Sequence, residues 1–194
     1  MAVLASDVWY ELSDHNPLEF HQGDIVRDLE VPDPDLLFLP ESVGDSILTF
    51  EFAVVISQDC DLIADQGNTY ALLCPAFTLD FLAQKGVRVR NLWTEARKGQ
   101  HTHYFPLREC TLMGWECQPR LVDFRQVYQM SLSNIDKLYR VQDKHVRIRS
   151  PYRFELVRRF AQKLTRIPFG DDLTTEWNDI EVLRQTHPSP PKGS

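Results

Sequence analysis

A short apolar run that ends in a cluster of polar side chains most constrains the fold of this chain. Residues 52–56 (FAVVI) are all apolar and rich in β-branched side chains, a pattern typical of a strand buried on both faces. The next five residues, 57–61, bring together a hydroxyl, an amide, a thiol and two carboxylates. Because a rigid strand that carries polar groups at its end is a common way to build a site, we expect a central strand over 50–57 with a site beside it.

Several other short apolar runs bounded by turn residues predict further strands. The expected strands lie near 24–31, 70–75, 103–107, 111–124 and 126–132. Short strands at such close spacing are typical of a small barrel or a strongly bent sheet. We therefore predict an α+β fold, mainly β, in the form of a bent barrel with a helix packed on it.

The clearest helix is predicted over 150–167. Ser150 is a good N-cap and Pro151 suits the first helical position. The apolar residues at helical spacing are Phe154, Val157, Phe160, Ala161, Leu164 and Ile167. If this stripe packs on the sheet, most of the helix cations must face solvent, because unpaired buried charges are too costly.

The length of 194 residues predicts one domain, which we place over 1–170 and follow with an acidic helix and a flexible tail over 171–194. No run approaches the length of a membrane span, and the N-terminus lacks the basic region of a signal peptide. The four cysteines form no CxxC pair, so we expect buried thiols and not disulfides. We expect a cytoplasmic protein and assign it no cofactor.

The net charge of −7 hides a strong asymmetry along the chain. Residues 1–75 carry 15 acidic side chains and one basic one, whereas residues 137–166 carry 10 basic and two acidic ones. Such a distribution bears on partners and association. The candidate contacts for RNA phosphates or for an acidic protein partner are Arg149, Arg153, Arg159, Lys163 and Arg166. The alternative is that these cations pair with the acidic part of the same chain, and the sequence pI of about 5.3 argues against general nucleic-acid binding.

The two carboxylates after the central strand are candidate metal ligands. Asp59 and Asp61 could bind a divalent cation with His103 as third ligand, and His101 or Asp123 are alternatives for that position. The competing interpretation is a turn in which the carboxylates accept backbone N–H groups. Sequence spacing alone leaves both interpretations open.

Cysteine and histidine chemistry is a further hypothesis for this region. Cys60 could act as a nucleophile with His101 or His103 as base, although a free cysteine beside a buried strand is more often an inert core thiol. The two histidines would share one face of a strand, where histidine pairs can hold zinc. The alternative is that both are ordinary surface histidines.

Three segments in order resemble the PemK/MazF family of small SH3-like barrels, whose best-known members are bacterial toxins that cut single-stranded RNA. Residues 23–26 (GDIV) resemble the opening strand of the family, residues 52–57 (FAVVIS) resemble its second strand, and residues 70–75 (YALLCP) stand where its third strand belongs. The resemblance covers residues 21–78 and implies an SH3-like bent barrel.

The chain departs from the toxins at the residues that carry their chemistry. The toxins have an Arg-Pro pair just before the second strand, and that arginine is catalytic; here the positions hold Glu51 and Phe52. A carboxylate there would repel an RNA phosphate instead of stabilising it. The second catalytic group of the family is a threonine or serine after the third strand, and Thr78 is the nearest equivalent. A divergent enzyme of this kind would use Thr78 with Arg27, or with the distal arginines, as its candidate catalytic residues.

A divergent branch of the family resembles the rest of the chain more closely. In that branch "SxDCD" follows the second strand and a final "SPYR…RFA" helix closes the protein, as residues 57–61 and 150–161 do here. We therefore predict a non-catalytic binding or regulatory subunit with a protein partner, in a toxin–antitoxin or phage-defence system. The alternative is a divergent endoribonuclease that cleaves single-stranded RNA. RNA and a second copy of the chain stay open as partners, and we expect no membrane.

Overall fold

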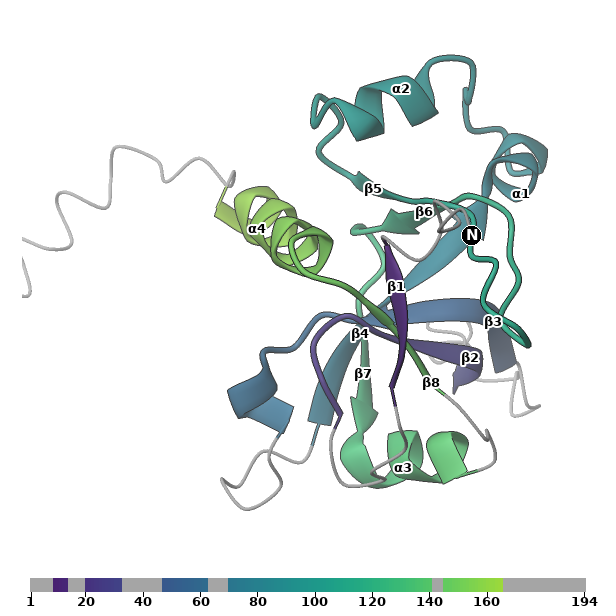
Figure 1. Cartoon of the computed structure of the whole chain (residues 1–194). Coiled ribbons are helices and arrows are strands. Elements are labelled where there is room, and N and C mark those ends of the chain that lie inside the picture. The colour runs from purple at the N-terminus through teal and green to yellow at the C-terminus, as the bar shows by residue number, and fades with distance from the viewer. Residues whose placement is uncertain (1–8, 14–19, 33–46, 63–69, 141–144, 166–194) are drawn as a thin grey trace, which may run out of the picture. The chain divides into compact units, whose positions relative to one another are not determined.

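The computed structural model describes residues 9–13, 20–32, 47–62, 70–140 and 145–165 (Figure 1). The chain divides into two compact units, Met1–Lys163 and Leu164–Ser194, and only Leu164 and Thr165 of the second unit are described. The acidic helix and tail that we predict over 171–194 therefore lie outside the described residues. No helix in the described part of the chain has the length and apolar character that a membrane span requires.

The described residues of the first unit form an antiparallel sheet of eight strands together with several helices. The strands are β1 (Tyr10–Ser13), β2 (Asp24–Pro32), β3 (Ile47–Val55), β4 (Tyr70–Thr78), β5 (Tyr104–Leu107), β6 (Arg120–Asp123), β7 (Tyr128–Ser131) and β8 (His145–Ile148). Their order is β1-β8-β2-β3-β4-β6-β5, and β7 also pairs with β4. The fold is α+β and mainly β, as predicted. The described strands do not close into a barrel, because β1 and β5 stand at opposite ends of the strand order.

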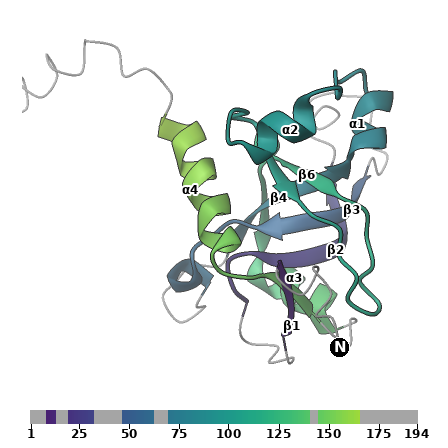
Figure 2. The same ribbon diagram turned by 45° about the horizontal axis from the view of Figure 1, so that its top comes forward.

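Four helices complete the described part of the unit. They are α1 (Leu79–Gln84), α2 (Leu92–Arg97), α3 (Leu132–Arg140) and α4 (Tyr152–Thr165), with a 3-10 turn at Asp59–Leu62. Both α1 and α2 belong to the stretch between β4 and β5. They lie next to β6, at the top of the view in Figure 2. Leu82 of α1 and Leu92 of α2 pack there against Tyr104 and Leu121.

Most predicted strands agree with the structure, and the disagreements have local causes. The strand predicted over 111–124 is wrong, because only Arg120–Asp123 is a strand. Upstream of β6 the chain turns back at Gly114, whose φ is +83°, and forms one isolated bridge between Cys110 and Cys117. The sequence analysis missed β1 and β8, which are four residues each and pair with one another.

The central strand is buried on both faces, as the apolar run predicts. Phe52 and Val54 belong to one core cluster, whereas Ala53 and Val55 belong to the other side of the sheet. β3 pairs with β2 along nearly its whole length, but with β4 only over Ala53–Val55. Pro75 faces Ala53 at the end of that ladder and has no N–H to donate.

From Ala76 onward, β4 pairs with β6 instead of β3. Its partners there run from Ala76 opposite Val122 to Thr78 opposite Arg120. The first half of β3 and the last half of β4 are thus not joined by a ladder. The pocket described below lies where these two half-strands diverge.

Of the stripe predicted for the helix, α4 fully buries only Phe160 among the described residues. Leu156 and Phe160 are buried, whereas Phe154 and Leu164 are exposed and Val157 is half-buried. Arg159 and Lys163 lie on the buried side, because residues three, four and seven positions apart share one face of a helix. The guanidinium of Arg159 donates to the Ala96 carbonyl and the ammonium of Lys163 donates to the Phe124 carbonyl. The prediction that these two cations face solvent is therefore wrong.

Candidate functional site

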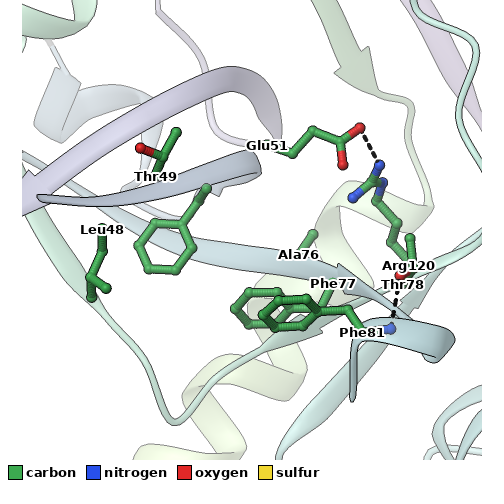
Figure 3. Close-up of a pocket in the computed structure, with 9 residues that line it drawn as sticks. Leu48, Thr49, Glu51, Ala76, Phe77, Thr78, Phe81 and Arg120 are labelled. Carbon is green, nitrogen blue, oxygen red and sulfur yellow. Dashed lines mark hydrogen bonds and ion pairs between the residues drawn. The ribbon is translucent and has the colours of Figure 1, made fainter. Parts of the chain in front are cut away.

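A pocket of about 300 Å³ opens where β3 and β4 diverge (Figure 3). It is lined by side chains from four elements, which are Leu48, Thr49, Phe50 and Glu51 of β3, Ala76, Phe77 and Thr78 of β4, Phe81 of α1 and Arg120 of β6. Its surface is mostly apolar, with a few polar groups at one side, which is the usual composition of a ligand pocket.

Three phenylalanines form the apolar wall. Phe77 and Phe81 are stacked with ring centroids 4.9 Å apart, and Phe50 meets Phe77 edge-on at 5.9 Å. Phe81 is 40 % exposed although it is a large aromatic side chain. The pocket therefore presents an aromatic surface that solvent can reach, of the kind that takes up apolar side chains in protein interfaces.

An ion pair forms the polar side of the pocket. Nη2 of Arg120 lies 2.6 Å from Oε1 of Glu51, and the side chains are 7 % and 60 % exposed. The guanidinium also lies over the Phe52 ring at 4.0 Å. Nε of Arg120 has no hydrogen-bond partner among the described residues. The carboxylate neutralises the one guanidinium that lines the pocket.

Thr78 lines the pocket and also caps the helix that follows it. Its Oγ1 accepts a hydrogen bond from the backbone N–H of Phe81 at 3.2 Å, with extended backbone angles. This is the role of an N-cap residue, which satisfies a backbone donor at the start of a helix. The cap also places Phe81 directly above the end of β4, beside Phe77.

Arg27, the other predicted catalytic residue, does not line the pocket. Its Nη1 donates to the Gly114 carbonyl at 2.8 Å, and its guanidinium lies 5.1 Å from the Phe52 ring and 5.0 Å from the Trp115 ring. The structure thus holds Arg27 by a backbone carbonyl and two aromatic faces. Thr78 and Arg27 are not brought together as a pair.

The predicted metal ligands lie in different surroundings. Oδ1 of Asp59 accepts the backbone N–H of Gln22 at 2.6 Å and lies 3.6 Å from Nδ1 of His21. His103 contacts His101, with ring centroids 5.8 Å apart, and the partial burial of His101 lowers its pKa. Asp61 lies in the 3-10 turn, and its side chain is outside the description. No three metal-binding side chains gather among the described residues.

Most of the predicted cationic surface is engaged within the chain. Nε of Arg149 lies 3.8 Å from Glu11, and the Arg153 guanidinium lies 5.4 Å from the Phe154 ring. Arg153 also packs on Gly23, where a Cβ would lie 2.9 Å from its Cγ. Arg159 and Lys163 bind backbone carbonyls, as described above, and Arg166 lies outside the described residues.

The buried thiols have the environment of core residues. Burial raises the pKa of Cys74 to about 12 and that of Cys110 to about 11. Thiols so far from ionisation at neutral pH are poor nucleophiles. Nothing is described of the Cys60 side chain, so its predicted nucleophilic role stays a prediction.

Arg120 and Phe81 are the most informative of the site residues that the sequence analysis did not identify. Arg120 stands just before the apolar pair Leu121–Val122, so a cation at the start of a buried strand was the available signal. Phe81 follows a threonine N-cap by three residues, which predicts the helix but not the pocket. Compared with protein-family models, curated proteins and solved structures, the chain matches none of them. Its function must therefore be argued from this geometry.

Proposed function

We propose that this protein is a non-catalytic binding module, which takes an apolar and preferably aromatic side chain of a partner protein into the pocket between β3 and β4. One observation carries the proposal: the guanidinium that lines the pocket is already paired with Glu51 at 2.6 Å. A catalytic arginine has to be free to stabilise charge that develops on the substrate. The paired arginine instead leaves an almost neutral pocket with aromatic walls.

The hydrogen bonds of the other predicted catalytic residues support the same proposal. The Thr78 hydroxyl accepts from a helix N-terminus, and the Arg27 guanidinium donates to the Gly114 carbonyl. The exposed ring of Phe81 offers the kind of contact that dominates binding energy in protein interfaces. The partner would insert its side chain between Phe81 and Leu48, with Thr49 and Glu51 available as hydrogen-bond acceptors at the rim.

We further propose that the module is a divergent PemK/MazF-like, SH3-like protein acting as a regulatory subunit in the cytoplasm, in a toxin–antitoxin or phage-defence system. The order of the strands near residues 24, 52 and 70 supports the resemblance. Glu51 in place of the toxin arginine supports a regulatory role. Arg120 of β6 forms an ion pair with the carboxylate of Glu51 on β3, so this pair gives the pocket no net charge.

One observation favours the alternative of a divergent endoribonuclease. Thr78 and Arg120 lie directly opposite one another in the β4–β6 ladder and both line the pocket. A hydroxyl and a guanidinium beside one cavity are chemically able to act on a phosphodiester if Glu51 is displaced. This alternative would use Arg120 in place of the predicted Arg27.

Purified protein incubated with single-stranded RNA, with and without Mg²⁺, tests the absence of catalysis. We expect intact RNA in both conditions. Metal-independent cleavage that is lost in both Thr78→Ala and Arg120→Gln, with an unchanged circular dichroism spectrum, would establish the endoribonuclease. Cleavage that needs metal and is lost in Asp59→Asn would instead establish the metal site.

Peptide selection tests the binding role. Random 12-residue peptides displayed on phage are selected on the full chain, and the affinity of the enriched peptides is measured by fluorescence anisotropy. We expect a large apolar or aromatic residue in the enriched peptides and binding at least about tenfold weaker in Phe81→Ala, since losing a central anchor costs ~1.4 kcal/mol or more. The matched control is Met113→Ala, an exposed apolar residue outside the pocket, which should leave binding unchanged. Equal effects of the two substitutions would refute the proposal.

A further inference from the structure

Five exposed cations of the stretch between β4 and β5 form a group of their own. We call them the 85–98 surface, and its members are Lys85, Arg88, Arg90, Arg97 and Lys98, all exposed. None of the side chains of the four from Arg88 onward forms an ion pair with, or donates a hydrogen bond to, any other part of the chain that the structure describes. Lys85 lies 5.6 Å from the Phe81 ring.

The packing of the intervening valines explains why these cations point outward. Val87 and Val89 are half-buried and pack against the cluster that contains Leu82 and Leu92. Arg88 and Arg90 alternate with them and are exposed. Both arginines belong to the loop between α1 and α2, whose course Figure 2 shows.

A polar recess accompanies this pair of arginines. It has a volume of about 530 Å³ and is lined by Arg88, Arg90, Asn91, Leu92 and Glu95. The recess thus offers guanidinium and amide donors around a small apolar floor. Glu95 is its single acidic member, so the lining carries a net positive charge although the whole chain has a net charge of −7.

We infer that the 85–98 surface binds the phosphodiester backbone of a single-stranded nucleic acid. Three of its five cations are arginines, whose planar donor fork matches phosphate oxygens. Because no described residue pairs with Arg88 or Arg90, their donors are available without breaking an internal contact. The surface has only a loop and the short helix α2, and neither a long helix nor a β-ribbon to enter the groove of a duplex. A single strand is therefore the better fit.

Anisotropy titrations of the full chain with fluorescein-labelled 20-nucleotide oligouridine and oligothymidine test this inference. For three or four phosphate contacts on a single strand, log Kd should rise with log salt with a slope of about 2–3. The variant Arg88→Gln/Arg90→Gln should bind about tenfold more weakly and lower that slope by about 1.4, since each phosphate contact contributes ~0.7. Binding of either oligomer satisfies the inference, and a difference between them reports contact with the 2′-hydroxyl.

The matched control is Lys137→Gln/Arg158→Gln, which removes two exposed cations elsewhere and changes the net charge equally. It should leave both affinity and slope unchanged. If the first variant fails to fold, Arg97→Gln/Lys98→Gln replaces it with the same expectation. Absence of binding, equal losses in the test and control variants, or displacement of RNA by polyglutamate at equal charge would overturn the inference, the last in favour of an acidic protein. The inference does not depend on the pocket, because the peptide assay with Phe81→Ala tests that role separately.

Discussion

Two neighbouring arginines of α4 should differ sharply in their contribution to stability, although both bind the same carboxylate. Nε of Arg158 and Nε of Arg159 each lie 2.7 Å from an oxygen of Glu155. The Arg158 side chain is 56 % exposed, whereas that of Arg159 is 15 % exposed. Arg159 also donates to the Ala96 carbonyl at 2.5 Å and lies over the Phe105 ring at 5.3 Å. Arg158 donates a second hydrogen bond to the same carboxylate, from Nη2 at 2.7 Å, so Arg158 makes the fuller ion pair and Arg159 has the more buried surroundings.

The expected magnitudes follow from these contacts. Solvent screens the exposed ion pair of Arg158, so Arg158→Ala should leave the free energy of unfolding nearly unchanged. A partly buried hydrogen bond to a charged group contributes ~1.5–3 kcal/mol, and Arg159 adds to this the packing of its stem. We expect Arg159→Ala to cost about 2–4 kcal/mol. That corresponds to a fall in melting temperature of roughly 4–16 °C for a chain of this size.

Urea unfolding followed by tryptophan fluorescence measures both free energies. The same pair of substitutions in a Glu155→Gln background lacks the shared negative charge, and the difference between the arginines should persist there, because it comes from the Ala96 carbonyl and the Phe105 ring. Equal losses for Arg158→Ala and Arg159→Ala in the natural background would refute the reasoning. A difference that vanishes with Glu155→Gln would show that the carboxylate, and not the buried contact, is responsible.

Three other predictions follow from the same unit. Asp24 is buried and its Oδ1 lies 2.5 Å from Nε of Arg147, so Asp24→Asn should cost about 3–5 kcal/mol by leaving that cation unpaired, and Asp24→Leu/Arg147→Met should restore most of the loss in thermal melts. The Arg158 and Arg159 hydrogen bonds lower the pKa of Glu155 from 4.5 to about 2; its stabilisation should be complete above pH 4.5 and lost as the pH falls through 2, a dependence that acid titration should find missing in Glu155→Gln. Because burial raises the pKa of Cys74 to about 12, this thiol should react with a maleimide only in urea, and labelling of Cys74 in the native protein at neutral pH would contradict its core position.

Part of the candidate site follows from the sequence because it is local. The position of Thr78 after an apolar strand, three residues before the N–H it accepts, identifies a helix cap without any tertiary information. Glu51 was identified at the entry of the central strand. Arg120 was not identified, because the ladder that places it opposite Thr78 joins segments separated by about forty residues. No local periodicity reports such a pairing.

The buried face of helix α4 likewise depends on contacts that the sequence alone does not reveal. Its sequence has two plausible apolar stripes, one through Phe154 and Val157 and one through Leu156 and Phe160, and periodicity alone cannot choose between them. The second stripe brings Arg159 with it into the packed face. The near-burial of Arg159 is tolerated because the Ala96 carbonyl accepts a hydrogen bond from its guanidinium. The polar group is therefore not buried without a partner.

The sequence by itself determined the features that depend on a few consecutive residues. These are the central strand buried on both faces and the start of α4 near Ser150. Only the tertiary structure decided which strands meet and which cations stay free, because both depend on partners far along the chain. Arg159 donates to a buried carbonyl. Arg88 and Arg90 alternate with half-buried valines, are exposed, and have no acceptor among the described residues. The difference is one of position in the fold, since the isolated side chains are chemically identical.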